Sequence, residues 1–512
     1  MKDPVLPQGE QLIIGGYLML DFTVEILKKY FQDNSFVASD IESFNRFIDK
    51  EFQKIIDENK EVEPTIIPPN VESFKIRLDK IWVTKPEITE ADGSRRVVYP
   101  QEARMRKLSY SAPIFMEISS HINDVQRETF TTQIGNMPVM LKSNYCHLNR
   151  LSKEELIERG EDPEDPGGYF IINGTERVLV NIEDLGANRF LVERTTGVSK
   201  ITGKLFSESG AYRIPHVMER LKDGIFYLSF TRVKRVPLIL VLKALGLTND
   251  EELMKNVSKE KQFDEVLINI FEFANVKTSE DALDTLAKKI GITQTKDIRL
   301  QRMSEIIDKF LLPHVGITKG DRVAKSLNLC KMIRKFLAVS TEEISTDDKD
   351  HYMNKRVKMS GDLLADLFRM NIKVLIGDLL YNFQRIVKRG KFPSIRVIIR
   401  DQLLTTRIYG AMATGNWVGG RKGISQRIQR TNNLNTISYL QKVVSPLSTS
   451  QENFEARELH PTHLGRLCPI ETPEGTNIGL RKNLALLASI STESDEDEVL
   501  TTLKGLGLRG LQ

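Results

Sequence analysis

Residues 454–480 read FEARELHPTHLGRLCPIETPEGTNIGL, and this run constrains the fold more closely than any other part of the 512-residue chain. It packs histidine, arginine, glutamate, proline and glycine too densely for a regular helix or strand. Proline fixes φ and glycine permits conformations closed to other residues, so together they predict a rigid, shaped loop. Glu471 and Glu474 could act as general acid and base or bind a metal, and His460 with His463 could be metal ligands. Because H-x-x-H without a third ligand is a weak zinc pattern, we favour hydrogen bonds and ion pairs that hold the loop.

The stretch before this loop has an unusual charge pattern. Residues 402–451 contain no aspartate or glutamate, although the chain has 69 acidic residues. They do contain basic residues interleaved with Asn, Gln, Ser and Thr, namely Arg407, Arg421, Lys422, Arg427, Arg430 and Lys442. Basic side chains neutralise phosphates, while amides and hydroxyls bond phosphate oxygens and sugars. The pattern predicts a surface that faces a polyanion; from charge alone, an ordinary basic surface loop is the alternative.

Hydrophobic periodicity predicts the main elements elsewhere. Asn173-Gly174 lies between two apolar, β-rich runs and predicts a hairpin with a type I′ turn. The apolar stripe of residues 360–390 predicts a long core helix, with Ser360 as its N-cap. Residues 18–59 and 248–336 are expected to be mostly helical, and residues 189–231 rich in strands.

Composition limits the class of protein. A chain of this length predicts about two to four domains. The formal net charge of +4 is close to neutral for 73 basic and 69 acidic residues. Three distant cysteines without a C-x-x-C pair argue against a zinc site or a disulfide framework, so reduced cysteines are expected. No signal peptide and no apolar run of the ~18 residues that span a bilayer are visible, so we expect a cytoplasmic protein that contacts no membrane.

The quoted loop resembles the signature HPTHxGRxCPIETPEGxNIGL of the second-largest subunit of multisubunit DNA-directed RNA polymerases. Further segments resemble the same family in the expected order: residues 103–113, 137–148, 167–178 and 350–356. The resemblance implies the N-terminal half of the subunit in its split archaeal form, homologous to the N-terminal half of the bacterial β subunit. It also implies an α+β multidomain fold. Residues 1–187 would form the first part of a protrusion domain, 188–345 a lobe, 346–404 the returning part of the protrusion, 405–488 a fork and 489–512 a C-terminal tail.

The resemblance further implies an enzyme that joins nucleoside triphosphates on a DNA template, with this chain inactive alone. Its partners would be the largest subunit, a separate C-terminal half of the second-largest subunit, the DNA template and the RNA transcript. In the family, Mg²⁺ is held mainly by an aspartate triad of the largest subunit. Asp347, Asp348 and Asp350 do not match that D-x-D-x-D pattern, and we expect a turn there. No catalytic residue and no metal or zinc site is therefore expected in this chain.

The resemblance assigns site residues to the fork. Gln426, Lys442 and Asn477 match positions near the growing RNA end, and Glu471 and Glu474 match acids close to the active centre. The residues expected to bind nucleic acid are Arg421, Lys422, Gln426, Arg427, Arg430, Asn432, Lys442, Arg457, Arg466 and Asn477. After Ile437-Ser438 the family commonly has a histidine and paired arginines, whereas this chain has only one basic group there, Lys442.

Two other hypotheses remain open from the residues themselves. The chain could be a free-standing nucleic-acid-binding or scaffold protein that uses the same domains. It could also be a self-sufficient hydrolase that uses Glu471, Glu474 and the two histidines. A subunit needs its partners for activity, whereas a hydrolase is active as a single purified chain.

Overall fold

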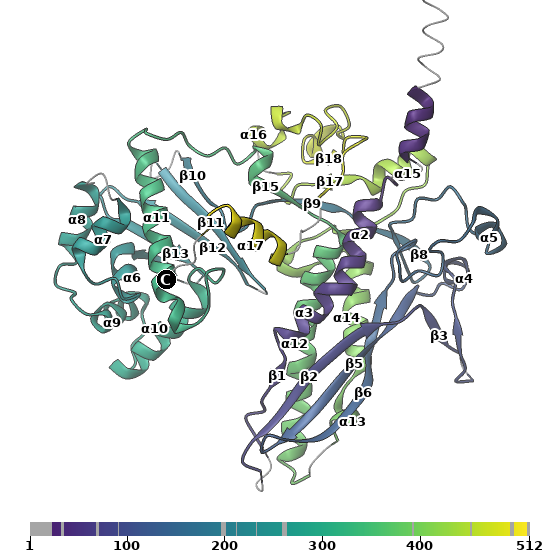
Figure 1. The fold of residues 1–512 in the computed structure, drawn as a ribbon, viewed down its shortest axis with the longest axis horizontal. Helices are drawn as coiled ribbons and strands as arrows, with labels where there is room; N and C mark the ends of the chain where they lie inside the picture. The colour runs from purple at the N-terminus through teal and green to yellow at the C-terminus, as the bar shows by residue number, and fades with distance from the viewer. Residues whose placement is uncertain are drawn as a thin grey trace, which may run out of the picture. The chain divides into compact units, whose positions relative to one another are not determined.

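The chain divides into two compact units in the computed structural model (Figure 1). The described residues are 23–31, 35–67, 71–90, 92–195, 201–210, 212–231, 233–258, 264–391, 394–450, 453–491 and 496–508. One unit comprises Met1–Glu183 with Val357–Gln512, and the other comprises Asp184–Arg356, so the second is inserted into the first. Both mix helices and sheets, which confirms the predicted α+β multidomain class.

An antiparallel sheet with the strand order β1-β2-β5-β6 forms the framework of the first unit. Side chains of β2 alternate between buried and part-exposed, and a register shift between Leu78 and Lys80 brings Ile81 and Val83 back to the buried face. This alternation arises because one face of the sheet packs on the core. The strands are β1 (Glu61–Val62), β2 (Phe74–Val83), β5 (Ser111–Ile122) and β6 (Val125–Pro138), with a separate hairpin of β3 (Glu87–Thr89) and β4 (Arg95–Val97).

Helices complete the core of the first unit. The ring of Phe52 stacks on Phe368 at 4.3 Å between centroids, and that of Phe74 stacks on Phe383 at 4.8 Å. These contacts join the N-terminal helices and the sheet to the long helix α12. The helices are residues 23–31, α2 (Ala38–Arg46), the π-helical turn η1 (Phe47–Glu51), α3 (Phe52–Asp57), α4 (Pro100–Met105), α5 (Lys153–Glu158), α12 (Ser360–Val387), α13 (Ile395–Ile398), α14 (Asp401–Thr414), α15 (Asn433–Leu440), α16 (Phe454–Arg457) and α17 (Glu496–Gly505).

The long helix α12 confirms the predicted element but begins differently. Met359, not Ser360, is the N-cap residue, and its N–H donates to the Asp362 carboxylate at 3.0 Å. The hydroxyl of Ser360 instead donates to the Asp40 carbonyl at 3.2 Å. Ser360 is buried against α2, so a tertiary contact takes the hydroxyl that local sequence assigned to capping.

The second unit is a five-stranded antiparallel meander followed by helices. Strands pair in sequence order: β10 (Phe190–Arg194), β11 (Ile201–Ser209), β12 (Tyr212–Arg220), β13 (Phe226–Phe230) and β14 (Val233–Pro237). The helices are α6 (Leu238–Ala244), α7 (Asp250–Val257), α8 (Asp264–Glu272), α9 (Ser279–Ile290), α10 (Lys296–Phe310) and α11 (Arg322–Ser340). Every residue of α6 is buried. The strand-rich and helical stretches predicted for this region are confirmed, as are the helices predicted within the described part of residues 18–59. Residues 18–22, 32–34, 196–200, 211 and 259–263 of these predictions lie outside the described residues.

Gly361 sets how closely α12 approaches α2, and its replacement tests this packing. A Cβ atom at Gly361 would lie 2.1 Å from the Ser43 carbonyl oxygen, so Gly361→Ala must displace one helix. We expect the substitution to destabilise the chain by about 1–3 kcal/mol, as overpacking does. Gly377→Ala, in the same helix with nothing within 4 Å, is the control, and we expect it to stabilise by roughly 0.5–1 kcal/mol. Thermal unfolding followed by circular dichroism measures both; equal midpoints would contradict the packing argument.

Candidate nucleic-acid interface

A short three-stranded sheet brings the acid-free stretch onto the predicted hairpin. β7 (Phe170–Ile172) and β8 (Thr175–Leu179) form the hairpin, and β16 (Ser425–Arg427) pairs antiparallel with β8. The turn residues Asn173 and Gly174 have φ of 50° and 72°, which confirms the predicted hairpin turn. Two segments far apart in the sequence therefore form one small surface.

The pairing of β8 with β16 places two arginines opposite each other. Arg427 is the register partner of Arg177. Burial, together with the charge of Arg427, lowers the pKa of Arg177. Among the described residues neither arginine has an acidic partner. Like charges directly opposite on neighbouring strands destabilise a sheet, so this pair is suited to an anion that neutralises both.

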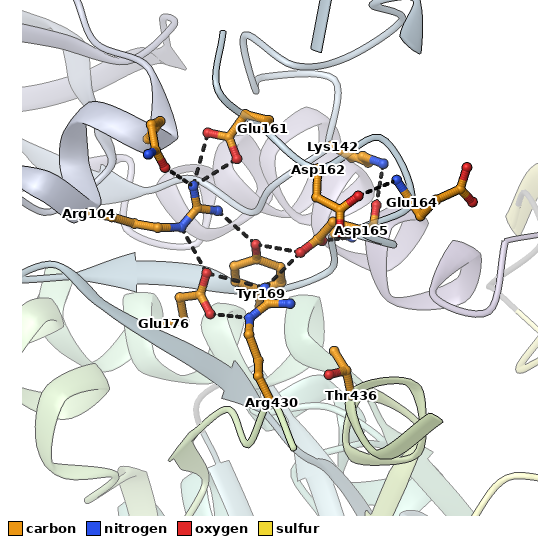
Figure 2. A network of polar contacts seen from close by, with 12 residues as sticks. Arg104, Lys142, Glu161, Asp162, Glu164, Asp165, Tyr169, Glu176, Arg430 and Thr436 are labelled. Atoms are coloured by element: carbon orange, nitrogen blue, oxygen red, sulfur yellow. Dashed lines mark hydrogen bonds and ion pairs between the residues drawn. The ribbon is translucent and has the colours of Figure 1, made fainter. Parts of the chain in front are cut away.

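Arg430, three residues further on, is instead held by acids of the same unit (Figure 2). Its guanidinium donates to Glu176 at 2.5 Å and to Asp165 at 2.7 Å. The guanidinium carbon lies 5.0 Å from the centroid of the Tyr169 ring, a cation–π distance. Burial acts to lower the pKa of Arg430, but the hydrogen bond to Glu176 and the nearby acidic charges raise it above its usual range.

Glu176 is shared with a second arginine from a different element. Arg104 on α4 donates to Glu176 at 2.8 Å, to Glu161 at 2.8 Å and to the Tyr169 hydroxyl at 2.8 Å. The Tyr169 hydroxyl in turn donates to Asp165 at 3.1 Å. Burial raises the pKa of Tyr169 well above its ordinary value, so the hydroxyl remains a donor. Figure 2 shows these side chains converging on Tyr169, so the network fixes Arg430 in place.

Lys442 and Gln426 are brought together by the ring of Tyr439. The Tyr439 hydroxyl donates to the Gln426 amide oxygen at 2.7 Å, and the Lys442 ammonium lies 3.7 Å from the Tyr439 ring centroid. Burial, and next the charge of Arg481, lower the pKa of Lys442, while Glu471 raises it. The Tyr439 side chain therefore contacts both Gln426 and Lys442, and it positions the Lys442 ammonium over its ring.

The predicted active-centre acids are placed on an exposed loop. Glu471 accepts a hydrogen bond from the Ser438 hydroxyl, and Asn483 donates to the same hydroxyl at 2.9 Å. Glu474 is exposed and is the N-cap residue of the turn η6 (Gly475–Asn477), which also contains Asn477. Of the two acids, Glu471 is therefore held by a hydrogen bond from Ser438, whereas Glu474 is exposed to solvent.

Several predicted site residues have local structural contacts. Arg457 donates to the carbonyls of Thr476 at 2.8 Å and Ile478 at 3.0 Å, and Arg466 donates to that of Thr462 at 3.0 Å. Asn432 caps α15 by accepting from the Asn435 N–H at 2.7 Å. Of the two other basic residues predicted to bind nucleic acid, Lys422 is exposed and Arg421 is half-buried. Nucleic-acid binding by these side chains stays a prediction.

The loop is anchored by a buried ion pair that the sequence did not indicate. β9 (Asn181–Leu185), β17 (Lys442–Val444) and β18 (Arg481–Asn483) are adjacent strands. The Lys482 ammonium of β18 lies 3.0 Å from the Glu183 carboxylate of β9, and both side chains are less than a tenth exposed. No local sequence pattern predicts this pair, because the two residues lie far apart in the sequence and come together only when their strands join the same sheet.

The acidic residues of this chain do not form a metal site in the part that the structure describes. No group of three or more His, Cys, Asp or Glu side chains lies together there. His460 and His463 have ring centroids 6.1 Å apart, and the His460 imidazole bonds the Thr462 hydroxyl at 2.7 Å. Asp347 pairs with Lys335 at 2.7 Å and Asp350 with Lys355 at 2.9 Å. These two carboxylates form ion pairs with lysines of their own unit.

Comparison with known proteins identifies the family. A family model described as RNA polymerase beta subunit matches residues 35–406, and a model of RNA polymerase Rpb2 domain 3 matches residues 426–490. The chain belongs to the RNA polymerase beta subunit family.

Among curated relatives, the chain is 44% identical to the DNA-directed RNA polymerase subunit Rpo2N of Methanocaldococcus jannaschii. That match covers 94% of this chain and 98% of the relative. It is 38% identical to Rpo2N of Halobacterium salinarum over 95% of this chain and 96% of the relative. It is 41% identical to Rpo2 of Saccharolobus shibatae, but there 96% of this chain covers only 43% of the relative.

No described helix is both long and apolar enough to cross a membrane.

The shared carboxylate of Glu176 offers a test of the network. Glu176→Gln removes the charge that both Arg104 and Arg430 bind, and we expect the chain to lose about 1.5–3 kcal/mol of stability. Arg427→Ala, at an exposed arginine without an acidic partner among the described residues, is the control; we expect it to lose no stability and to gain up to about 1 kcal/mol, because it removes the repulsion with Arg177. Urea unfolding followed by circular dichroism distinguishes the two. Equal stability of Glu176→Gln and wild type would show that the network does not hold the fold.

Proposed function

We propose that this chain is the N-terminal half of the second-largest subunit of an archaeal DNA-directed RNA polymerase and synthesises RNA only within the assembled enzyme. The proposal rests on the share of each relative's length that this chain covers. The chain matches nearly the whole of Rpo2N from Methanocaldococcus jannaschii but 43% of Rpo2 from Saccharolobus shibatae. Its partners are then the largest subunit, a separate C-terminal half, the DNA template and the RNA transcript, in the cytoplasm.

In this proposal, each predicted domain has a distinct role. Residues 1–187 and 346–404 form the protrusion and residues 188–345 the lobe, which together make one jaw around DNA. Residues 405–488 form the fork, whose loops contact the RNA–DNA hybrid near the active centre, and residues 489–512 form a tail. The inserted compact unit, Asp184–Arg356, supports treating the lobe as a separate body.

The chemistry of nucleotide addition belongs to other chains of the assembly. Mg²⁺ ions would stabilise the attacking 3′ oxygen and the leaving pyrophosphate, and the largest subunit holds them in this proposal. The contribution of this chain is to position the nucleic acid. Arg177 and Arg427 bind backbone phosphate, because they present two charges at one place without an internal counterion among the described residues. Arg430 has a structural role, since its own charge is bound by Glu176 and Asp165.

Assembly is the direct test of the proposed function. A tagged chain is expressed in its host and purified under native conditions, and the co-purifying chains are identified by mass. We expect a polymerase largest subunit and a separate second-half chain, together with template-dependent RNA synthesis. A stable monomer without partners would contradict the proposal and favour a free-standing binding protein; hydrolase activity of the single chain would favour an enzyme that uses Glu471 and Glu474.

The arginine pair gives a residue-level test in the assembled enzyme. Arg177→Ala and Arg427→Ala should each make RNA–DNA hybrid binding less dependent on salt, because each removes one phosphate contact. We expect the slope of log affinity against log salt to fall by roughly 0.7–0.9 per contact. Arg334→Ala, an exposed arginine on α11, is the control and should leave the slope unchanged. Retention of transcripts by stalled complexes across a salt series measures the effect; unchanged slopes for both variants would remove these arginines from the interface.

A further inference from the structure

The last described helix, α17, begins and ends through local signals in its own sequence. Acidic residues occupy its first turn, where the helix dipole favours negative charge. At its end, Gly507 has φ of +97° and its N–H donates to the Lys504 carbonyl at 3.1 Å. The Leu508 N–H donates to the Leu503 carbonyl at 2.9 Å, which completes a Schellman motif. The sequence therefore specifies a helix of defined length.

This helix carries an apolar stripe that the described part of the chain does not cover. Val499, Leu500, Leu503 and Leu506 recur at the spacing that places them on one face. They are between 42% and 80% exposed. Asp497, Glu498, Thr501 and Lys504 occupy the other face. The Thr501 hydroxyl bonds the Asp497 carbonyl at 2.7 Å, so it does not extend toward another element.

A helix of this kind needs a partner surface. Isolated helices shorter than ~12–15 residues are marginal in water, and α17 has 10 residues, among them β-branched Val499, Thr501 and Thr502. Exposed leucines on one face stabilise such a helix only when another surface buries them. Its composition thus fits a docking helix rather than a solvated tail.

The coverage of the relatives indicates what binds this stripe. The family models end at residue 490, before α17, and the Rpo2 relatives of Saccharolobus contain a large further part that this chain does not match. When that part is a separate polypeptide, an interface must replace the covalent connection. A parallel pair of α17 helices from two copies of this chain would bring their acidic first turns close together, and this repulsion disfavours that arrangement.

We propose that the apolar stripe of α17 docks on the separate chain that corresponds to the unmatched part of these single-chain relatives. The proposal rests on the proposed function, since it takes that second chain as the partner. In the assembly, Leu500 and Leu503 lie at the centre of the contact and the acidic face stays in solvent.

The experiment compares two charge-adding double variants in the full assembly. Leu500→Asp with Leu503→Asp places charge in the stripe, and Thr501→Asp with Lys504→Asp places it on the opposite face. The tagged chain is co-expressed with the second-half chain and the other subunits, and retention of the second-half chain is measured in competition with wild type. We expect the stripe variant to bind at least about 30-fold more weakly, as loss of two buried leucines predicts. The control variant should bind within about threefold, since it changes no buried group.

A photo-crosslinking residue at position 503 or 501 gives a second readout that does not depend on destabilising the helix. Crosslinks from position 503, and not from 501, should join the second-half chain. Binding of the stripe variant equal to wild type, crosslinks to another subunit, or dimers of this chain joined through position 503 would each overturn the inference. Any of these three results, obtained while the wild-type chain retains the largest subunit and makes RNA, would leave the proposed function intact and show only the docking site to be wrong. If wild type retains no partner, the proposed function itself fails.

Discussion

The carboxylate of Glu176 lies between the guanidinium groups of Arg104 and Arg430, and the arrangement of the surrounding surface depends on that shared charge. Arg104 comes from α4, Glu176 from the hairpin and Arg430 from the acid-free stretch, so one anion joins three segments. Because these side chains are only partly exposed, the loss of any one charge leaves another without compensation at low effective dielectric. Tyr169 completes the arrangement by bonding Arg104 and Asp165 and by offering its ring to Arg430.

This network separates the positive charges of the stretch into two kinds. The charge of Arg430 is neutralised by Glu176 and Asp165 of the same unit, and these ion pairs stabilise the segment that follows β16. Arg177 and Arg427 are paired across β8 and β16 without an acidic partner among the described residues, and their mutual repulsion favours binding of an anion. Not every basic residue of such a stretch is therefore available to an anion. Some of them, such as Arg430, form internal ion pairs that stabilise the surface on which the others lie.

The loop of residues 454–480 also contains both residues with structural contacts and residues that are exposed. Arg457 and Arg466 bond backbone carbonyls, and the buried pair of Lys482 with Glu183 ties the end of the loop to a strand from the N-terminal part of the chain. Glu474 remains at the surface. A rigid loop on a sheet with such anchors can hold exposed groups in a fixed geometry, as positioning of a bound nucleic acid requires. The apolar face of α17 adds a different kind of surface, one suited to another protein chain.

Sequence patterns were enough to predict the family, the α+β class, the Asn173-Gly174 turn and the long helix, because each depends on residues close together in the chain or on a long specific motif. They also located the acid-free stretch, since charge composition needs no structure. They placed the cap of α12 one residue too late, because burial of Ser360 against α2 overrides a local preference. Three contacts could be found only in the folded chain: Arg430 binds Glu176, Arg177 faces Arg427, and Lys482 binds Glu183. These pairs join residues far apart in the sequence, and only strand pairing and packing bring their charges within contact distance.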